Sequence, residues 1–232
     1  MESKSDGMDR YSVLVFSKTT GFRHDSIAQG IATIRELGDA NGFSVVATED
    51  AGVFTPQQLQ QYRAVVFLST TGDVLDAAQQ QAFEGFIRGG GGFVGVHSAT
   101  DTEYGWAWYG KLVGATFASH PAVQNAAIDV LDRGHVSTRM LPPHWSRRDE
   151  WYNFQMVPAP GVKILLQLDE SSYQGGSMGT PHPIAWYQHY DGGRSWYTGL
   201  GHTVESYQEP LFRQHLLGGI QWAAGAPFAK TT

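Results

Sequence analysis

The chain has 232 residues, of which 41% are hydrophobic and 12% aromatic, enough to bury the core of one sizeable domain. A formal net charge of -6 argues against nucleic acid as a partner, and no apolar run approaches the roughly 18 residues of a membrane span. The absence of cysteine excludes disulfides, zinc-thiolate sites and thiol catalysis. Because residues 1–10 are too polar for a signal peptide, we expect a cytoplasmic protein.

The first half of the chain alternates between apolar strands and amphipathic helices. Strands are predicted at 12–17, 44–48, 64–69 and 93–96, and helices at 26–42, 76–88 and 106–113. Ser26 and Gln29 have the spacing of a capping box, and Gly89 is placed to end the second helix. This alternation favours a parallel sheet with right-handed crossovers.

The second half has a different pattern, with strands and no long helix between them. Strands are predicted at 122–131, 162–168, 183–189 and 195–200, followed by a helix at 210–224. The sequence Asp191-Gly192-Gly193 predicts a hairpin between the last two strands. We therefore expect one α/β domain over residues 11–225, with antiparallel strands at the sheet edge and flexible tails at 1–10 and 226–232.

His97 stands where a strand ending in a sharp turn usually presents a nucleophile. The run GFVGVHS at 92–98 resembles the strand–turn–helix element of α/β hydrolases and glutamine amidotransferases, but neither Cys nor Ser occupies position 97. Acyl-enzyme chemistry from this turn is therefore not expected.

Four sequence blocks resemble the ThuA-like family, named after a trehalose-utilisation protein. They are FSKTTGFRH at 16–24, GFVGVHSA at 92–99, DEWY at 149–152 and GLGH at 199–202. The resemblance implies a flavodoxin-like, mostly parallel sheet flanked by helices, similar to class I glutamine amidotransferases. It also implies a connection with the catabolism of sugars and keto-sugars.

Comparison with the amidotransferase site points to proton transfer. His97 takes the position of the catalytic cysteine, and His202 follows a late strand with Glu205 three residues on, one more than the usual spacing. Imidazole transfers protons or binds metals near neutral pH and is rarely a covalent nucleophile, which excludes glutaminase activity.

Several side chains should converge beyond the carboxyl ends of the strands, where open α/β sheets bind ligands. We predict His97, His202 and Glu150 as catalytic, with Glu150 desolvated by its aromatic neighbours, although it could instead form a rim ion pair. The predicted substrate-binding residues are Arg23, His24, Asp101, Trp106, His120, Trp151 and Tyr152. A loop histidine is more often merely solvated, and Asp101 could equally cap the helix at 106–113.

A metal and two functional classes remain open. Three of His24, His97, His120 and His202 could form a zinc site, but no H-E-x-x-H or comparable spacing supports one. One class is an enzyme acting on a sugar or keto-sugar, a hydrolase, lyase or isomerase that uses His and Glu for proton transfer. The other is a non-catalytic carbohydrate-binding accessory protein, and either is compatible with a homo-oligomer.

Overall fold

A nine-stranded sheet runs through the computed structural model, which describes residues 10–226. Five strands are parallel, in the order β2 (Phe43–Thr48), β1 (Tyr11–Phe16), β3 (Ala64–Leu68), β4 (Gly92–Val96) and β11 (Gly193–Thr198). Four antiparallel strands continue it, in the order β10 (Pro183–Tyr190), β9 (Lys163–Asp169), β6 (Gln124–Val130) and β7 (His144–Asp149). The predicted α/β fold with a parallel core and an antiparallel edge is confirmed.

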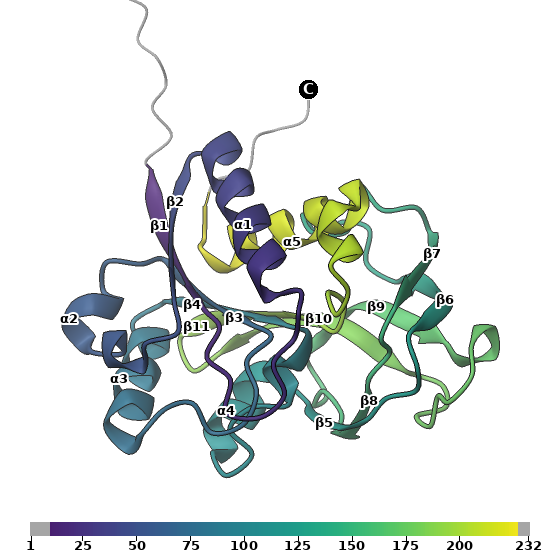
Figure 1. The fold of residues 1–232 in the computed structure, drawn as a ribbon, viewed down its shortest axis with the longest axis horizontal. Helices are drawn as coiled ribbons and strands as arrows, with labels where there is room; N and C mark the ends of the chain where they lie inside the picture. The colour runs from purple at the N-terminus through teal and green to yellow at the C-terminus, as the bar shows by residue number, and fades with distance from the viewer. Residues whose placement is uncertain (1–9, 227–232) are drawn as a thin grey trace, which may run out of the picture.

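Helices cover both faces of the parallel half, as Figure 1 shows. On one face lie α1 (Ile27–Asn41) and α5 (Pro210–Ala223), and on the other lie α3 (Ala77–Arg88) and α4 (Ala107–Val113). The short α2 (Pro56–Leu59) packs beside α3. Four 3₁₀ helices lie in the connections, η1 (Ala51–Val53), η2 (His97–Thr100), η3 (Glu170–Ser172) and η4 (Glu205–Gln208).

Local sequence explains most helix ends. Asp76 and Gln79 form a reciprocal capping box at the start of α3, and Gly42 ends α1 in the left-handed conformation that glycine adopts without a steric penalty. The capping box predicted at Ser26 is wrong. The Ser26 hydroxyl instead donates to the Gly201 carbonyl, 3.3 Å away, so it joins α1 to the segment after β11.

The antiparallel half contains elements that the sequence pattern did not predict. These are β7 and a separate two-stranded sheet formed by β5 (Thr116–Ser119) and β8 (Asn153–Met156). Strand β7 alternates regularly, but its buried face carries Arg147 and Asp149 as well as Trp145. A polar buried face conceals the period of two from a hydrophobicity pattern.

The core is continuous across both halves of the sheet. Phe67 on β3 is fully buried and contacts aromatic rings from several elements, including Phe83 on α3 and Phe93 on β4. On the opposite face, α5 approaches β11 closely because Gly219 lies against the Trp196 ring. Burial of this apolar surface is the main stabilising contribution to the fold.

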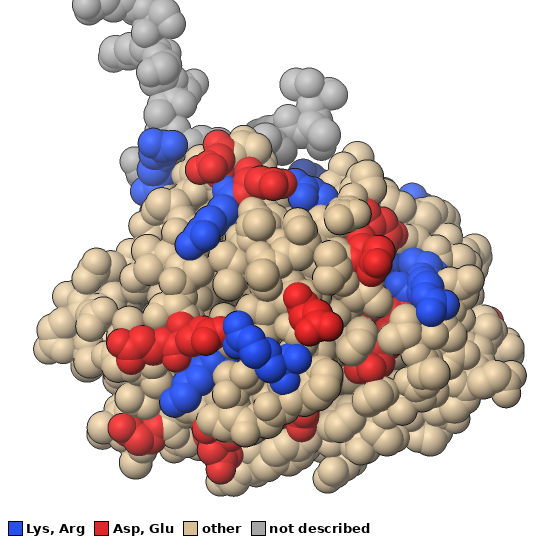
Figure 2. Space-filling view, in the orientation of Figure 1, with Lys and Arg blue, Asp and Glu red and all other residues tan. Residues whose placement is uncertain are grey.

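The face of the molecule that carries α1 is mixed in charge. In Figure 2, acidic and basic side chains alternate over the face that carries α1 and do not gather into one large patch. Within residues 10–226, no helix has both the length and the hydropathy needed to cross a bilayer. The predicted tails at 1–10 and 226–232 lie outside the described residues apart from Arg10 and Ala226.

Candidate functional site

Four side chains converge beyond the carboxyl ends of the parallel strands. His24 follows β1, His97 follows β4, His202 follows β11, and Glu150 comes directly after β7. One potential ligand atom from each of them lies within 4.8 Å of the others, and three of the four residues are buried. We call these four residues the His/Glu cluster.

His97 has the backbone conformation of a strained turn. Its φ of 52° lies in the left-handed region, and its side chain leaves the end of β4 toward the other members of the His/Glu cluster. The Nδ1 atom lies 2.8 Å from the Gly199 carbonyl oxygen and donates to it, which leaves Nε2 as the ring nitrogen available to a second partner. That Nε2 faces Glu150 and His202.

Glu150 lies between three imidazole rings. Its Oε1 is 3.3 Å from His97 Nε2 and 3.2 Å from His202 Nδ1, and its Oε2 is 3.1 Å from His120 Nδ1. Burial alone would raise the pKa of Glu150, but hydrogen bonds and positive charge from His202 and His97 hold it well below its usual range. The carboxyl group is therefore ionised, unlike the raised-pKa acid that the aromatic neighbours suggested.

The two remaining histidines of the cluster differ in their electrostatic surroundings. Burial, reinforced by His97 and His202, lowers the pKa of His24 to about 3, so this ring is neutral. Burial also lowers the pKa of His202, but the hydrogen bond and charge of Glu150 outweigh it, and the net direction is upward. His24 packs edge-on to both other rings, with centroids 4.8 Å from His97 and 5.1 Å from His202.

Three of the four members of the cluster have ligand atoms at the spacing that a tetrahedral metal ion requires. Bonds of about 2.0–2.1 Å from zinc to nitrogen and oxygen place neighbouring ligand atoms about 3.3–3.4 Å apart. His97 Nε2, His202 Nδ1 and Glu150 Oε1 form a triangle with sides of 3.2, 3.3 and 3.2 Å. A cation or a proton shared between His97 and Glu150 would stabilise this close approach. This buried group could therefore hold a metal ion.

His120 and Tyr152 lie beside the cluster. His120 Nδ1 donates towards Glu150 Oε2 and the Pro121 carbonyl, and its side chain is 43% exposed. The Tyr152 ring lies 4.3 Å from that of His97, between centroids. Asp101 accepts a 2.6 Å hydrogen bond from Tyr104 and does not cap α4, so the capping alternative is wrong. Its pKa is raised by burial.

Three predicted substrate-binding residues lie elsewhere. Arg23 forms an exposed ion pair with Glu49, on the outside of the loop that carries His24. The Trp106 indole donates to Glu84 on α3, and the fully buried Trp151 indole donates to the Gln124 carbonyl. The sequence places these three residues in loops but does not give the direction in which each side chain points.

Sequence reasoning missed two residues that the structure places beside the cluster. The Phe22 ring lies edge-on to the His24 ring, with 4.9 Å between the ring centroids, and Phe22 is 67% exposed. A large apolar side chain beside the cluster is therefore accessible to solvent. Asp149 is fully buried and accepts from the backbone amides of Glu150, Gly201 and His202. Both lie within the sequence blocks that carry the family resemblance, which was the available signal.

Comparison with known proteins agrees with this architecture. A ThuA-like protein from Bacteroides uniformis superposes with a TM-score of 0.77 at 22% identity, covering 92% of this chain and 91% of that one. A ThuA-like protein from Parabacteroides merdae gives a TM-score of 0.79 at 20% identity, covering 95% and 92% of the two chains. A β-galactosidase from Bacillus circulans sp. alkalophilus gives a TM-score of 0.61 at 13% identity. The match covers 93% of this chain and 31% of the β-galactosidase chain. These likenesses show a shared fold.

No curated protein matches the sequence. The family model described as trehalose utilisation matches residues 12–223, which is nearly the whole of the described chain. With the expected fold and the four sequence blocks in place, the chain belongs to the ThuA family.

Proposed function

We propose that this protein is an enzyme that processes a sugar or keto-sugar, in the context of trehalose utilisation, and that its His/Glu cluster binds zinc. Membership of the ThuA family supports the sugar context. The convergence of three imidazole nitrogens and a carboxylate oxygen supports the chemistry. A protein that only bound carbohydrate would need exposed aromatic rings but would not need this buried set of ionisable groups.

The observation that carries the proposal is the anchoring of His97. Metal-binding histidines usually donate their second ring N–H to a carbonyl or carboxylate, which fixes the tautomer and aims the other nitrogen at the metal. The hydrogen bond from His97 Nδ1 to the Gly199 carbonyl has this arrangement. His97, His202, Glu150 and His24 would hold the ion, which when bound supplies a Lewis acid for a substrate oxygen or a bound water.

The surrounding residues suggest how the chain would act on a substrate. His120 is half-exposed, and its Nδ1 is engaged by Glu150 and Pro121, so its Nε2 is left for a proton on the substrate side. The exposed Phe22 ring offers a flat apolar surface for the C–H face of a sugar. In a keto-sugar the carbonyl acidifies the neighbouring C–H, and His120 would then transfer the proton during isomerisation, elimination or hydrolysis.

A substrate panel with controlled metal content tests this proposal. The protein is stripped with a chelator, reloaded with zinc or magnesium, and incubated with disaccharides and their 3-keto forms, with the products followed by mass spectrometry. We expect turnover only after zinc is restored. Turnover that survives chelation would overturn the metal and leave proton transfer by His and Glu. Binding of sugars without turnover under any metal condition would overturn the enzyme and support the carbohydrate-binding alternative.

A further inference from the structure

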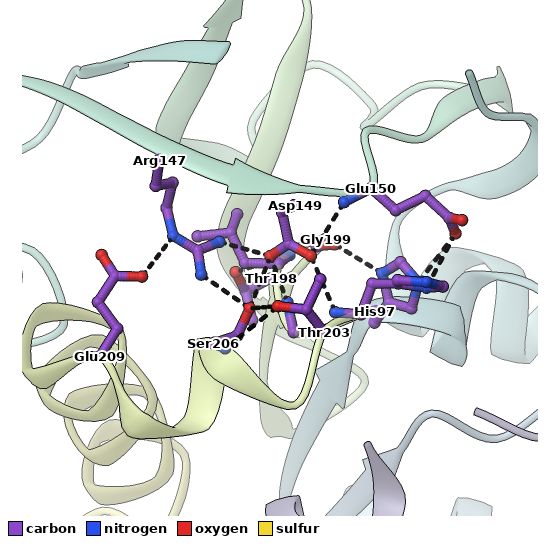
Figure 3. A network of polar contacts seen from close by, with 12 residues as sticks. His97, Arg147, Asp149, Glu150, Thr198, Gly199, Thr203, Ser206 and Glu209 are labelled. Atoms are coloured by element: carbon purple, nitrogen blue, oxygen red, sulfur yellow. Dashed lines mark hydrogen bonds and ion pairs between the residues drawn. The ribbon is translucent and has the colours of Figure 1, made fainter. Parts of the chain in front are cut away.

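A buried carboxylate outside the His/Glu cluster joins the two segments that supply much of it. Asp149 ends β7 and is fully buried. Its Oδ1 accepts from the backbone N–H of Glu150 at 3.0 Å and of His202 at 3.1 Å, and its Oδ2 accepts from Gly201 at 2.9 Å. Figure 3 shows Asp149 between the end of β7 and the segment after β11, with Glu150 and His97 beside it.

These hydrogen bonds connect parts of the chain that are distant in sequence. Asp149 and His202 are 53 residues apart, and no hydrogen bond of the main sheet pairs β7 with β11, because β10, β9 and β6 lie between them. One carboxylate therefore sets where the backbone of Glu150 lies relative to that of His202. The side chains of these two residues meet 3.2 Å apart, between Oε1 and Nδ1.

Arg147 fixes Asp149 in turn. Its guanidinium group donates to Asp149, to Ser206 at 2.9 Å and to Glu209 at 2.9 Å. It also lies over the rings of Trp145 and Phe212, each 5.2 Å from its central carbon. The guanidinium group is planar, and each of its three nitrogens donates a hydrogen bond, so the group has little freedom to rotate. It therefore holds the Asp149 carboxylate in one orientation. Figure 3 shows this chain of contacts from Glu209 to Asp149.

The opposite charges of Arg147 and Asp149 also stabilise each other in this network. Burial alone would raise the pKa of Asp149, but the charge of Arg147 and the N–H donor of Gly201 reverse the direction, and the pKa is lowered. A carboxylate supplies two acceptor oxygens, whereas an amide supplies one and turns an N–H₂ group toward the remaining donors. Asparagine therefore keeps the shape of this side chain but cannot accept all of these backbone N–H groups.

We propose that Asp149 is the positioning residue of the site, which sets the distance between Glu150 and His202 and thereby the ability of the cluster to hold a cation. This inference rests on the proposed function where it concerns zinc and on geometry alone where it concerns the Glu150–His202 distance. Outer residues of this type commonly change metal affinity by about 10–100-fold when they are replaced.

The experiment compares Asp149→Asn with a matched control, Glu103→Gln. Glu103 is also a buried carboxylate, and it accepts from the backbone N–H groups of Val74 and Leu75 at 2.8 Å, but it contacts no member of the His/Glu cluster. Zinc affinity is measured by competition with a chromophoric chelator, thermal stability by calorimetry, and the Glu150–His202 distance by crystallography. We expect Asp149→Asn to weaken zinc binding by about 10–100-fold and to widen that distance. The control should keep both values even if it melts at a lower temperature.

The outcomes separate this inference from the proposed function. If the unsubstituted protein binds no zinc, the proposed metal is wrong, and the crystal structures still decide the role of Asp149. An unchanged Glu150–His202 distance in Asp149→Asn overturns the inference, as does an equal loss of zinc affinity in the control. If Asp149→Asn does not fold, Ser206→Ala replaces it. This substitution removes one hydrogen bond to Asp149 and one from Arg147 and keeps both charges, so it should give a smaller loss in the same direction.

Discussion

His97 combines a strained backbone, a ring held by its hydrogen bond to Gly199, and contacts with two other members of the cluster. Replacing it with alanine removes the ring that faces both Glu150 and His202. We expect His97→Ala to lose stoichiometric zinc and to lower turnover by about 10²-fold or more. Zinc content by elemental analysis and steady-state rates on the sugar panel provide the measurement.

The matched control for that variant is His144→Ala. His144 also pairs with a carboxylate, Asp129, at 2.7 Å, but its side chain is 83% exposed, and within residues 10–226 it belongs to no group of potential metal ligands. It should keep full zinc content and full turnover. Equal losses in the two variants would show that the effect of His97→Ala does not come from the cluster.

A second histidine, His215, should make the fold sensitive to acid. It is fully buried on α5, with Nδ1 at 2.9 Å from the Ser137 carbonyl, and burial lowers its pKa to about 3. The unfolded chain takes up this proton near pH 6.5 while the folded chain does not, so stability falls as pH drops from about 6.5 toward 3. The slope reaches about 1.4 kcal/mol per pH unit for one such group.

Urea unfolding between pH 7 and pH 5 measures this effect. His215→Gln keeps a donor and an acceptor but cannot be protonated, so its free energy of unfolding should fall less steeply than that of the unsubstituted protein. His189→Gln, on the exposed end of β10, should leave the slope unchanged. A steeper fall in His215→Gln would contradict the assignment.

At the scale of single residues, the sequence named all four members of the cluster but not Asp149, which supports it. His24, His97 and His202 follow apolar strands, so their meeting at one sheet edge could be predicted from topology. Asp149 could not be assigned, because its role depends on backbone amides that only the folded chain brings together. The same applies to Trp151, whose burial reverses the exposure that a loop position suggested.

At the scale of secondary-structure elements, two glycines determine how closely α5 approaches the sheet. A Cβ at Gly219 would lie 2.5 Å from the Trp196 ring, and one at Gly218 would lie 2.5 Å from the Ser137 backbone. Since the helix cannot move away without opening the core, we expect Gly219→Ala to destabilise the fold by about 1–3 kcal/mol despite the better helix propensity of alanine. Thermal or urea unfolding measures the change.

Gly85 on α3 provides the control, because a Cβ there would meet no atom within 4 Å. Gly85→Ala should stabilise the protein by roughly 0.5–1 kcal/mol, the ordinary gain when alanine replaces glycine inside a helix. If both variants were stabilised, the close contact of α5 with β11 would not constrain the helix.

The sequence pattern predicted those strands and helices in which one face is apolar along its whole length. Strand β3 is buried along its whole length, and its apolar run revealed it. Strand β7 was not predicted because the ion pair of Arg147 and Asp149 occupies its buried face. The Ser26 cap failed for a related reason, since a tertiary partner on Gly201 competes for its hydroxyl.

At the scale of the whole molecule, a metal bound by the His/Glu cluster would link the parallel and antiparallel halves of the sheet. Glu150 follows β7 at the antiparallel edge, whereas His24, His97 and His202 follow parallel strands. An ion that binds only the folded state adds stability, about 2.7 kcal/mol when its concentration is 100 times its dissociation constant. We therefore expect zinc to raise the melting temperature.

Calorimetry with zinc, with magnesium and with a chelator measures this linkage. Magnesium prefers oxygen ligands in an octahedral arrangement and should have little effect on a set of three imidazoles. The same titration on His97→Ala should show no rise with zinc. A rise of equal size in that variant would place the binding elsewhere on the surface.

The wide spacing of the cluster along the chain has a consequence for the order of events during synthesis. His202 and His97 are 105 residues apart, and the ring that completes the cluster lies near the C-terminal helix. Loop closure over such a separation is costly in entropy and must precede the contact. A nascent chain still missing its last strand and helix would present His24 and His97 without their partners. We therefore expect the ion to be acquired only after the segment that carries His202 has folded against β4, so that metal loading reports on the folding of this part of the chain.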